Sequence, residues 1–125
     1  ASNLSVNSNV AGEDGGGISF TVSAAHSVST LLDSRVSNNT CRGNGGGIFL
    51  VGARLLASRS SFEDNLADNN GGGISVESSI IVLCNTTRVV RNACNGMNGG
   101  GASVATGSTL IANSNSSFEG NFAVL

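Results

Sequence analysis

Several residue types are missing from this 125-residue chain, and the absences narrow what it can do. Lysine, proline, tryptophan, tyrosine and glutamine do not occur, and six arginines face eight acidic residues for a formal net charge of −2. This balance argues against a nucleic-acid binder, which neutralises phosphates with clustered Lys and Arg. The five phenylalanines are the only aromatic residues, so a platform for stacking bases is not expected either. Without a run of about 18 apolar residues, we expect no transmembrane helix.

Glycine (18), serine (20) and asparagine (16) are abundant instead. Such a bias is common in disordered chains, but 39% hydrophobic residues with a low net charge is not. The composition therefore indicates a regular structure rich in turns, and the length indicates a single domain, residues 1–125. Because the chain begins at Ala1 and its only methionine is Met97, we expect a segment or repeating unit of a longer stalk or fibre.

Two sequence elements recur in phase along the whole chain. Glycine triplets stand at 15–17, 45–47, 71–73 and 99–101, at intervals of 30, 26 and 28 residues. The second element is an apolar residue three positions before an asparagine, with a small residue two positions after it. Its five instances are Val6/Asn9/Ala11, Val36/Asn39/Cys41, Phe62/Asn65/Ala67, Val89/Asn92/Cys94 and Phe118/Asn121/Ala123. A period of 26–30 residues predicts a repeat architecture.

Between these elements the residues alternate with the two-residue period of strands. Ile18, Phe20 and Val22 enclose Ser19 and Thr21, and no stretch shows a helical period with caps. Short strands joined by tight turns predict an all-β solenoid, a parallel β-helix of a little over four coils, in which inward residues stack between neighbours. The glycines are expected to turn the chain sharply with φ > 0.

The recurring asparagines predict a hydrogen-bonded ladder inside the solenoid. A buried Asn at a corner can bond its own turn and the Asn amide of the next coil, as identical positions do at β spacing. The predicted ladder comprises Asn9, Asn39, Asn65, Asn92 and Asn121. We expect Asn65 to be buried and bonded to its neighbours, and Ser58 to be exposed.

The glycine triplets and the asparagine-containing elements together resemble the repeat of a known family. GGGI at 15–18, 45–48 and 71–74, alternating with FEDN at 62–65 and FEGN at 118–121, resembles the polymorphic outer-membrane-protein repeat, which pairs GGA[I/L/V] with FxxN. This repeat is best known from chlamydial surface adhesins, and the resemblance implies a right-handed parallel β-helix. The third glycine stands where the family usually has alanine, and three coils carry Val in place of Phe.

The three cysteines leave two interpretations open. Cys41, Ala67 and Cys94 share a slot in consecutive coils, so Cys41 and Cys94 lie roughly 9–10 Å apart, too far for a disulfide. Cys84 and Cys94 belong to one coil and form the candidate disulfide. The alternative is three unpaired thiols that pack as small core residues.

Neither a metal site nor a catalytic pair is predicted. His26 is the only histidine and lies on the longest coil without the further ligands that zinc needs, so we interpret it as a surface residue. Glu63 and Glu119 share a slot two coils apart, roughly 9–10 Å, near the upper limit for an inverting glycosidase pair. Val90 separates them and the slot lies on an outward turn, so we interpret them as a solvated acidic spot. We expect no cofactor.

Four asparagines lie in N-glycosylation sequons: Asn3, Asn38, Asn85 and Asn115. Asn3 and Asn115 share a slot and are predicted to point outward on one edge, where a secreting eukaryotic source would add glycan. The sequence thus favours a non-enzymatic extracellular stalk, fibre or adhesin, secreted or at the cell surface. Its expected partners are further coils of the chain or neighbouring copies stacked end to end. The alternatives are a carbohydrate-active β-helix enzyme and a ligand-binding module, which a pocket outside the packed core would support.

Overall fold

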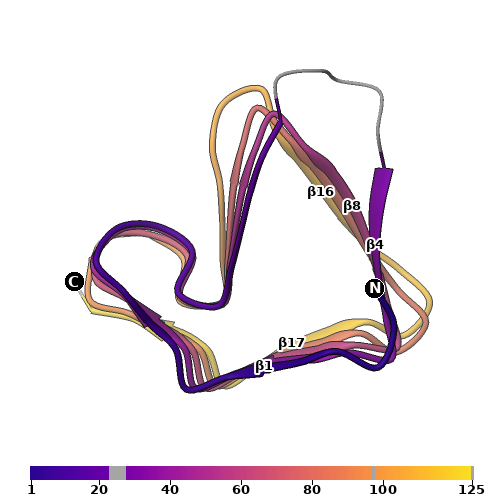
Figure 1. Ribbon diagram of the computed structural model, residues 1–125, viewed down its shortest axis with the longest axis horizontal. Coiled ribbons are helices and arrows are strands. Elements are labelled where there is room, and N and C mark those ends of the chain that lie inside the picture. The colour runs from indigo at the N-terminus through magenta and orange to yellow at the C-terminus, as the bar shows by residue number, and fades with distance from the viewer. Residues whose placement is uncertain (23–27, 97, 125) are drawn as a thin grey trace.

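The computed structural model describes residues 1–22, 28–96 and 98–124, and these residues form a β-solenoid. Viewed along the solenoid axis, the coils superimpose in a three-sided outline with a rounded lobe on one side (Figure 1). His26, interpreted above as a surface residue, lies outside the described residues. The described residues contain only strands and turns, and none of them belongs to a helix long and apolar enough to span a membrane.

Four parallel sheets, named A to D here, run along the solenoid. Each of four full coils contributes one strand to each sheet, and β17 and β18 add a fifth strand to two of them. Sheet B contains β1 (Ser5–Asn7), β5 (Arg35–Ser37), β9 (Ser61–Glu63), β13 (Arg88–Val90) and β17 (Ser117–Glu119). Sheet C contains β2 (Val10–Ala11), β6 (Thr40–Cys41), β10 (Leu66–Ala67), β14 (Ala93–Cys94) and β18 (Phe122–Ala123). Sheet D contains β3 (Ile18–Thr21), β7 (Ile48–Val51), β11 (Ile74–Glu77) and β15 (Ala102–Val104). Sheet A contains β4 (Val28–Leu32), β8 (Arg54–Ser58), β12 (Ile80–Cys84) and β16 (Thr109–Ala112).

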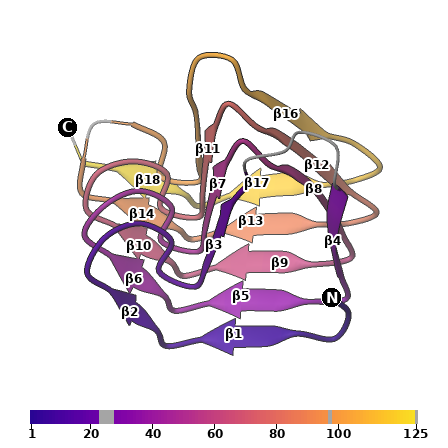
Figure 2. The ribbon, with the colours of Figure 1, turned by 45° about the horizontal axis from the view of Figure 1, so that its top comes forward.

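The chain passes through the sheets in the order B, C, D, A, so coil one is β1–β4, coil two β5–β8, coil three β9–β12 and coil four β13–β16. In Figure 1 the first coil faces the viewer and the chain runs clockwise as it recedes, which makes the solenoid right-handed. Figure 2 shows the coils as stacked layers from β1 to β17. The predicted right-handed parallel β-helix is confirmed.

The register agrees with the phase of the repeats. Val6 pairs with Val36, Val36 with Phe62, Phe62 with Val89 and Val89 with Phe118. Ala67 pairs with both Cys41 and Cys94. Residues of the same repeat position therefore stack directly on one another along the axis.

The interior is filled by the inward residues of the alternating pattern. Phe62, Ile48, Leu50, Ile74 and Leu83 are each fully buried. Each contacts its equivalents one coil above and below, so burial is complete in the middle coils, while Phe118 in β17 remains 41% exposed.

Within each glycine triplet only the first residue needs the left-handed conformation, with φ of +61° to +69° in all four coils. The second and third glycines are required for space instead. A Cβ on Gly46 would overlap the Gly72 carbonyl oxygen of the next coil, and a Cβ on Gly47 would lie 2.9 Å from the amide nitrogen of Asn65. The expectation that successive glycines all supply φ > 0 is therefore wrong for two of every three.

Candidate functional site

The five asparagines of the predicted ladder stack at the corner between sheets B and C, and hydrogen bonds join each to the next. The side-chain amides of the first four each donate to the Oδ1 atom of the asparagine one coil further on, at 2.9–3.0 Å. The backbone N–H of the same residue donates to that oxygen as well, at 2.9–3.1 Å. Asn39, Asn65 and Asn92 are at most 1% exposed. The ladder runs in one direction, so the oxygen of every asparagine faces the preceding coil.

From the second coil on, each ladder asparagine also donates an amide hydrogen to the preceding coil. Asn39, Asn65, Asn92 and Asn121 donate to the carbonyl oxygens of Val6, Val36, Phe62 and Val89, at 2.8–3.1 Å. An asparagine in the middle of the ladder thus satisfies a corner that would otherwise bury unpaired backbone groups.

Hydroxyl side chains accept hydrogen bonds in the same way at two further corners, which were not predicted from the sequence. At the corner between sheets A and B, the N–H of Leu4 donates to the Oγ of Ser34, and the N–H of Ser34 donates to the Oγ of Ser60. At the corner between sheets D and A, the N–H of Ala53 donates to the Oγ of Ser79 at 2.9 Å. The signal was present, because Ser34 and Ser60 each stand two residues before the apolar residue of the repeat.

A residue with positive φ precedes each of these inward polar side chains. Asn38, Asp64 and Arg91 precede the ladder asparagines, with φ of 54°, 53° and 51°. Asp33 and Arg59 precede the hydroxyl residues, with φ of 50° and 47°. Each corner therefore consists of one left-handed residue followed by one inward hydrogen-bonding side chain.

Four of these left-handed corner residues form ion pairs between coils. Arg59 binds Asp33 through two hydrogen bonds of 2.7 and 2.9 Å, and Arg91 binds Asp64 through two of 2.8 and 2.9 Å. These guanidinium groups lower the pKa of both aspartates below the usual value near 3.8. The pairs are exposed, so each contributes little to the free energy of unfolding.

Glu63 and Glu119 also belong to ion pairs. Glu63 lies 2.9 Å from Arg35, and Glu119 lies 3.6 Å from Arg88. Val90 of the intervening strand pairs with both glutamates in register, as the repeat phase predicts. Neither carboxylate lines the groove beside sheet D or the two smaller pockets at residues 59, 85–86 and 114–115 and at residues 52–54, 78–80 and 107. Among the described residues no cluster of His, Cys, Asp and Glu suits a metal ion.

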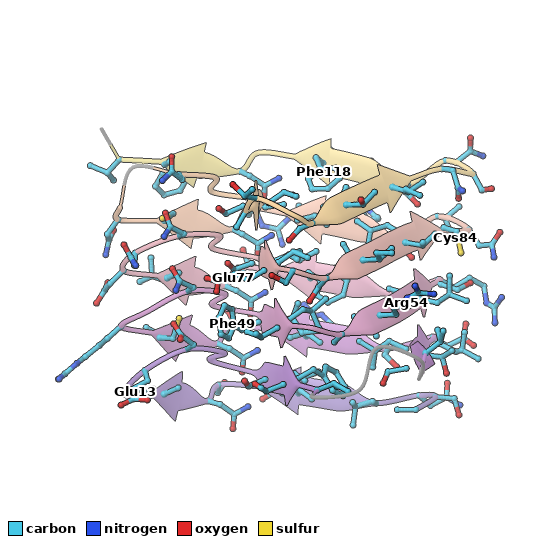
Figure 3. The ribbon with its side chains drawn as sticks, turned by 90° about the horizontal axis from the view of Figure 1, so that it is seen from above. Glu13, Phe49, Arg54, Glu77, Cys84 and Phe118 are labelled. Atoms are coloured by element: carbon cyan, nitrogen blue, oxygen red, sulfur yellow. The ribbon has the colours of Figure 1, made fainter. Side chains whose placement is uncertain are left out.

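The predicted disulfide between Cys84 and Cys94 is absent, and all three cysteines are free. Cys84 ends β12 in sheet A, whereas Cys94 lies in β14 of sheet C, and these sheets occupy different sides of the coil (Figures 1 and 3). The buried Cys94 thiol donates to the carbonyl of Asn69 at 3.0 Å. Burial raises the pKa of Cys41. Both buried thiols act as small core side chains.

The four sequon asparagines are all exposed and all have positive φ, between 49° and 63°. Asn3 and Asn115 stand two residues before Ser5 and Ser117, which occupy one column of sheet B, so both lie at the corner between sheets A and B. Asn85 donates to the Oγ of Ser58, which is 3% exposed, so the expectation of an exposed Ser58 is wrong.

A groove outside the core lies between sheet D and the turn lobe, the loops that connect sheet C to sheet D (residues 12–17, 42–47, 68–73, 95–96 and 98–101). Its volume is about 530 Å³, and its polar lining includes Asn70, Ser75, Glu77, Asn98 and Ser103. Along the turn lobe runs a second amide ladder, in which Asn98 donates to Asn70, Asn70 to Asn44 and Asn44 to Asp14.

The chain is a right-handed parallel β-helix built from sequence repeats, since its coils stack in register, polar ladders join the corners, and apolar side chains fill the interior. The family model for the Chlamydia polymorphic membrane protein repeat matches residues 33–50 and 59–77, which confirms the resemblance at two sites. Each matched segment runs from a left-handed corner residue through sheets B and C and the glycine triplet into sheet D, and residues 51–58, which include β8, lie between them. No curated protein and no solved structure matches the chain significantly.

Proposed function

We propose that this chain is a non-enzymatic structural or adhesive β-helix of the extracellular space or cell surface. The match to a repeat named for chlamydial membrane proteins supports this location. The observation that carries the proposal is the unbroken Asn ladder, because it fixes every coil at the same orientation as the one before it. A solenoid of this kind presents its outward side chains in straight columns, which suits a rod that spaces or displays contact surfaces.

The carboxylates support a non-enzymatic reading. An inverting glycosidase needs a water-filled gap between its two acids. Glu63 instead lies beside Arg35 and Arg91, and Glu119 beside Arg88. Both carboxylates are thus engaged in ion pairs, and Val90 of the intervening strand lies between them in the sheet.

The two ends of the solenoid are complementary, which supports end-to-end contact with a further coil of the same repeat. At the first coil, the Oδ1 of Asn9 accepts no hydrogen bond from the described residues, and Val10 is 84% exposed. At the last strands, the backbone N–H of Asn121 donates to none of the described residues, and Phe122 is 58% exposed. In phase, Asn121 of one unit donates to Asn9 of the next and Phe118 covers Val6, whether the next coil belongs to the same chain or to a second copy.

The sequon residues fit the same location. Asn3 and Asn115 lie exposed on one edge, away from the groove, so glycans there would leave both the ladder and the groove free. We propose that these sites carry glycan when a eukaryotic host secretes the chain.

Cell attachment tests the adhesive function. Fluorescent beads coated with the folded chain are expected to attach to epithelial cells and to stay attached under flow. Beads coated with the heat-unfolded Asn65→Ala variant serve as the unfolded control and are expected to detach. Equal attachment of folded-chain beads and albumin-coated beads would refute the adhesive role. Negative-stain imaging at rising protein concentration tests the stacking. Rods that lengthen with concentration are expected, and particles of constant size would refute self-association.

A further inference from the structure

The polar groove beside sheet D opens over coils three and four only. Its lining comes from the turn lobe at residues 70 and 98–99, from the outward Ser75, Glu77 and Ser103 of β11 and β15, and from residues 102 and 104–106 of the last coil. In Figure 1 this region is the concave side between the rounded lobe and sheet D.

A single outward position determines where the groove is open. Ser75 pairs in register with Phe49 on one side and Ser103 on the other. In coil two this position carries Phe49, whose large side chain is only 7% exposed and therefore packed against its surroundings. The serines of coils three and four are smaller, and the groove lies over them. Figure 3 shows Phe49 and Glu77 in adjacent layers of the solenoid.

The groove lining contains several hydrogen-bonding groups that have no partner among the described residues. Ser75 is 3% exposed, yet its hydroxyl forms no hydrogen bond with the described residues. Glu77 forms no ion pair with the described residues. The hydroxyl of Ser103 and the Oδ1 of Asn98 complete a set of one carboxylate, two hydroxyls and an amide oxygen. Among the described residues the fully buried side-chain oxygen without a partner is that of Ser116, so the Ser75 hydroxyl keeps contact with the groove and can exchange water there for a ligand that supplies the hydrogen bond.

We propose that this groove binds a neutral oligosaccharide, which rests on the adhesive function proposed above and names its ligand class. Sugar hydroxyls both donate and accept, so they match the Ser75 and Ser103 hydroxyls, and two neighbouring sugar hydroxyls can donate to the Glu77 carboxylate. An acidic sugar is disfavoured because its carboxylate would face Glu77. An apolar ligand is disfavoured because it would leave these polar groups unpaired.

Saturation-transfer NMR with defined sugars tests the proposal on the whole chain. The probes are maltotetraose, cellotetraose, mannotetraose and chitotetraose, with tetragalacturonate as the acidic comparison. At least one neutral tetrasaccharide is expected to receive saturation, and tetragalacturonate is not.

Three variants locate the binding. Ser75→Phe copies the residue that coil two carries at the same position, so it is expected to fold normally and to abolish binding. Ser103→Phe fills the other half of the groove in the less buried coil four and serves if Ser75→Phe fails to fold. Glu77→Gln is expected to weaken binding about tenfold, as loss of a hydrogen bond to a charged group does. Glu13→Gln, on the turn lobe outside the groove lining, is the matched control and is expected to leave binding unchanged.

Two outcomes would overturn the proposal. One is the absence of saturation transfer to all four neutral sugars at millimolar concentration, and the other is binding that persists in folded Ser75→Phe or Ser103→Phe. The bead assay separates this failure from failure of the adhesive function. Attachment that persists with Ser75→Phe beads means that adhesion stands and uses another surface.

Discussion

Replacing Asn65 by alanine removes the centre of the Asn ladder. The Asn65 side chain accepts from the backbone N–H and the Nδ2 of Asn39, at 3.1 and 3.0 Å. It donates to the carbonyl of Val36 and to Asn92, at 3.0 and 2.9 Å. The substitution therefore leaves two buried donors of Asn39 without an acceptor. Each unsatisfied buried group costs about 1–3 kcal/mol, so we expect a loss of about 2–6 kcal/mol in the free energy of unfolding. That is a large share of the roughly 6–19 kcal/mol that a chain of this length has.

The matched control for this variant is Asn9→Ala at the open end of the same ladder. Asn9 is exposed and only donates within the described residues, so its removal leaves Asn39 with the backbone N–H of residue 9 as a donor. We expect a loss of about 0.5–1.5 kcal/mol, the net value of one hydrogen bond. Urea unfolding followed by far-UV circular dichroism measures both variants. Equal midpoints for Asn65→Ala and Asn9→Ala would refute the reasoning, because the ladder would then contribute no more inside the solenoid than at its end.

Three further predictions concern the glycines, the core and the ion pairs. Gly46→Ala is expected to lower the free energy of unfolding by about 1–3 kcal/mol or more, because the added Cβ overlaps the backbone of the next coil. The control Gly12→Ala has open space around its Cβ and should change the urea midpoint little. Phe62→Ala should cost about 3–5 kcal/mol, and Phe62→Val should cost less because the adjacent coils carry valine at that position; similar losses would contradict the stacked core. The pKa of Asp64 is lower in the folded state because Arg91 donates two hydrogen bonds to its carboxylate. The stability that this pair contributes is therefore present above about pH 4 and is lost as the pH falls through the folded-state pKa. Thermal melts between pH 2 and 7 should therefore show a shallower acid loss for Asp64→Asn than for wild type, and parallel curves would exclude this linkage.

The fold could be predicted from the sequence because its signals repeat. The glycine triplets and the asparagines recur in every coil, and a position that recurs at a fixed period must stack in a parallel solenoid. Val6, Val36 and Phe62 align in the structure as they align in the sequence. The register between strands of neighbouring coils follows from the phase of the sequence repeat, so the repeat alone predicts which strands pair.

The groove and the cysteine geometry were not predictable in the same way, since each depends on a single coil. Ser75 and Phe49 occupy equivalent positions, and only the structure shows that the groove lies over the serine and that the phenylalanine is packed. The predicted Cys84–Cys94 disulfide is wrong because the distance across a coil between sheets A and C cannot be read from the sequence. The hydroxyl corners were overlooked for another reason, because Ser34 and Ser60 are common residues whose phase is easily lost in a serine-rich chain.

The one-coil reach of every ladder bond has a consequence for how this molecule forms and opens. Ladder partners are 26–33 residues apart, and each coil bonds to its direct neighbours alone. The first pairing of two coils must therefore close a long loop before it gains contacts, which makes nucleation slow, and each further coil then adds to an existing edge. Opening proceeds in the reverse order, with β1 and β17 at the outer layers fraying before β7 and β11 in the middle. Amide hydrogen exchange should follow this order as a gradient of protection that rises from both ends of the rod toward Ile48 and Ile74.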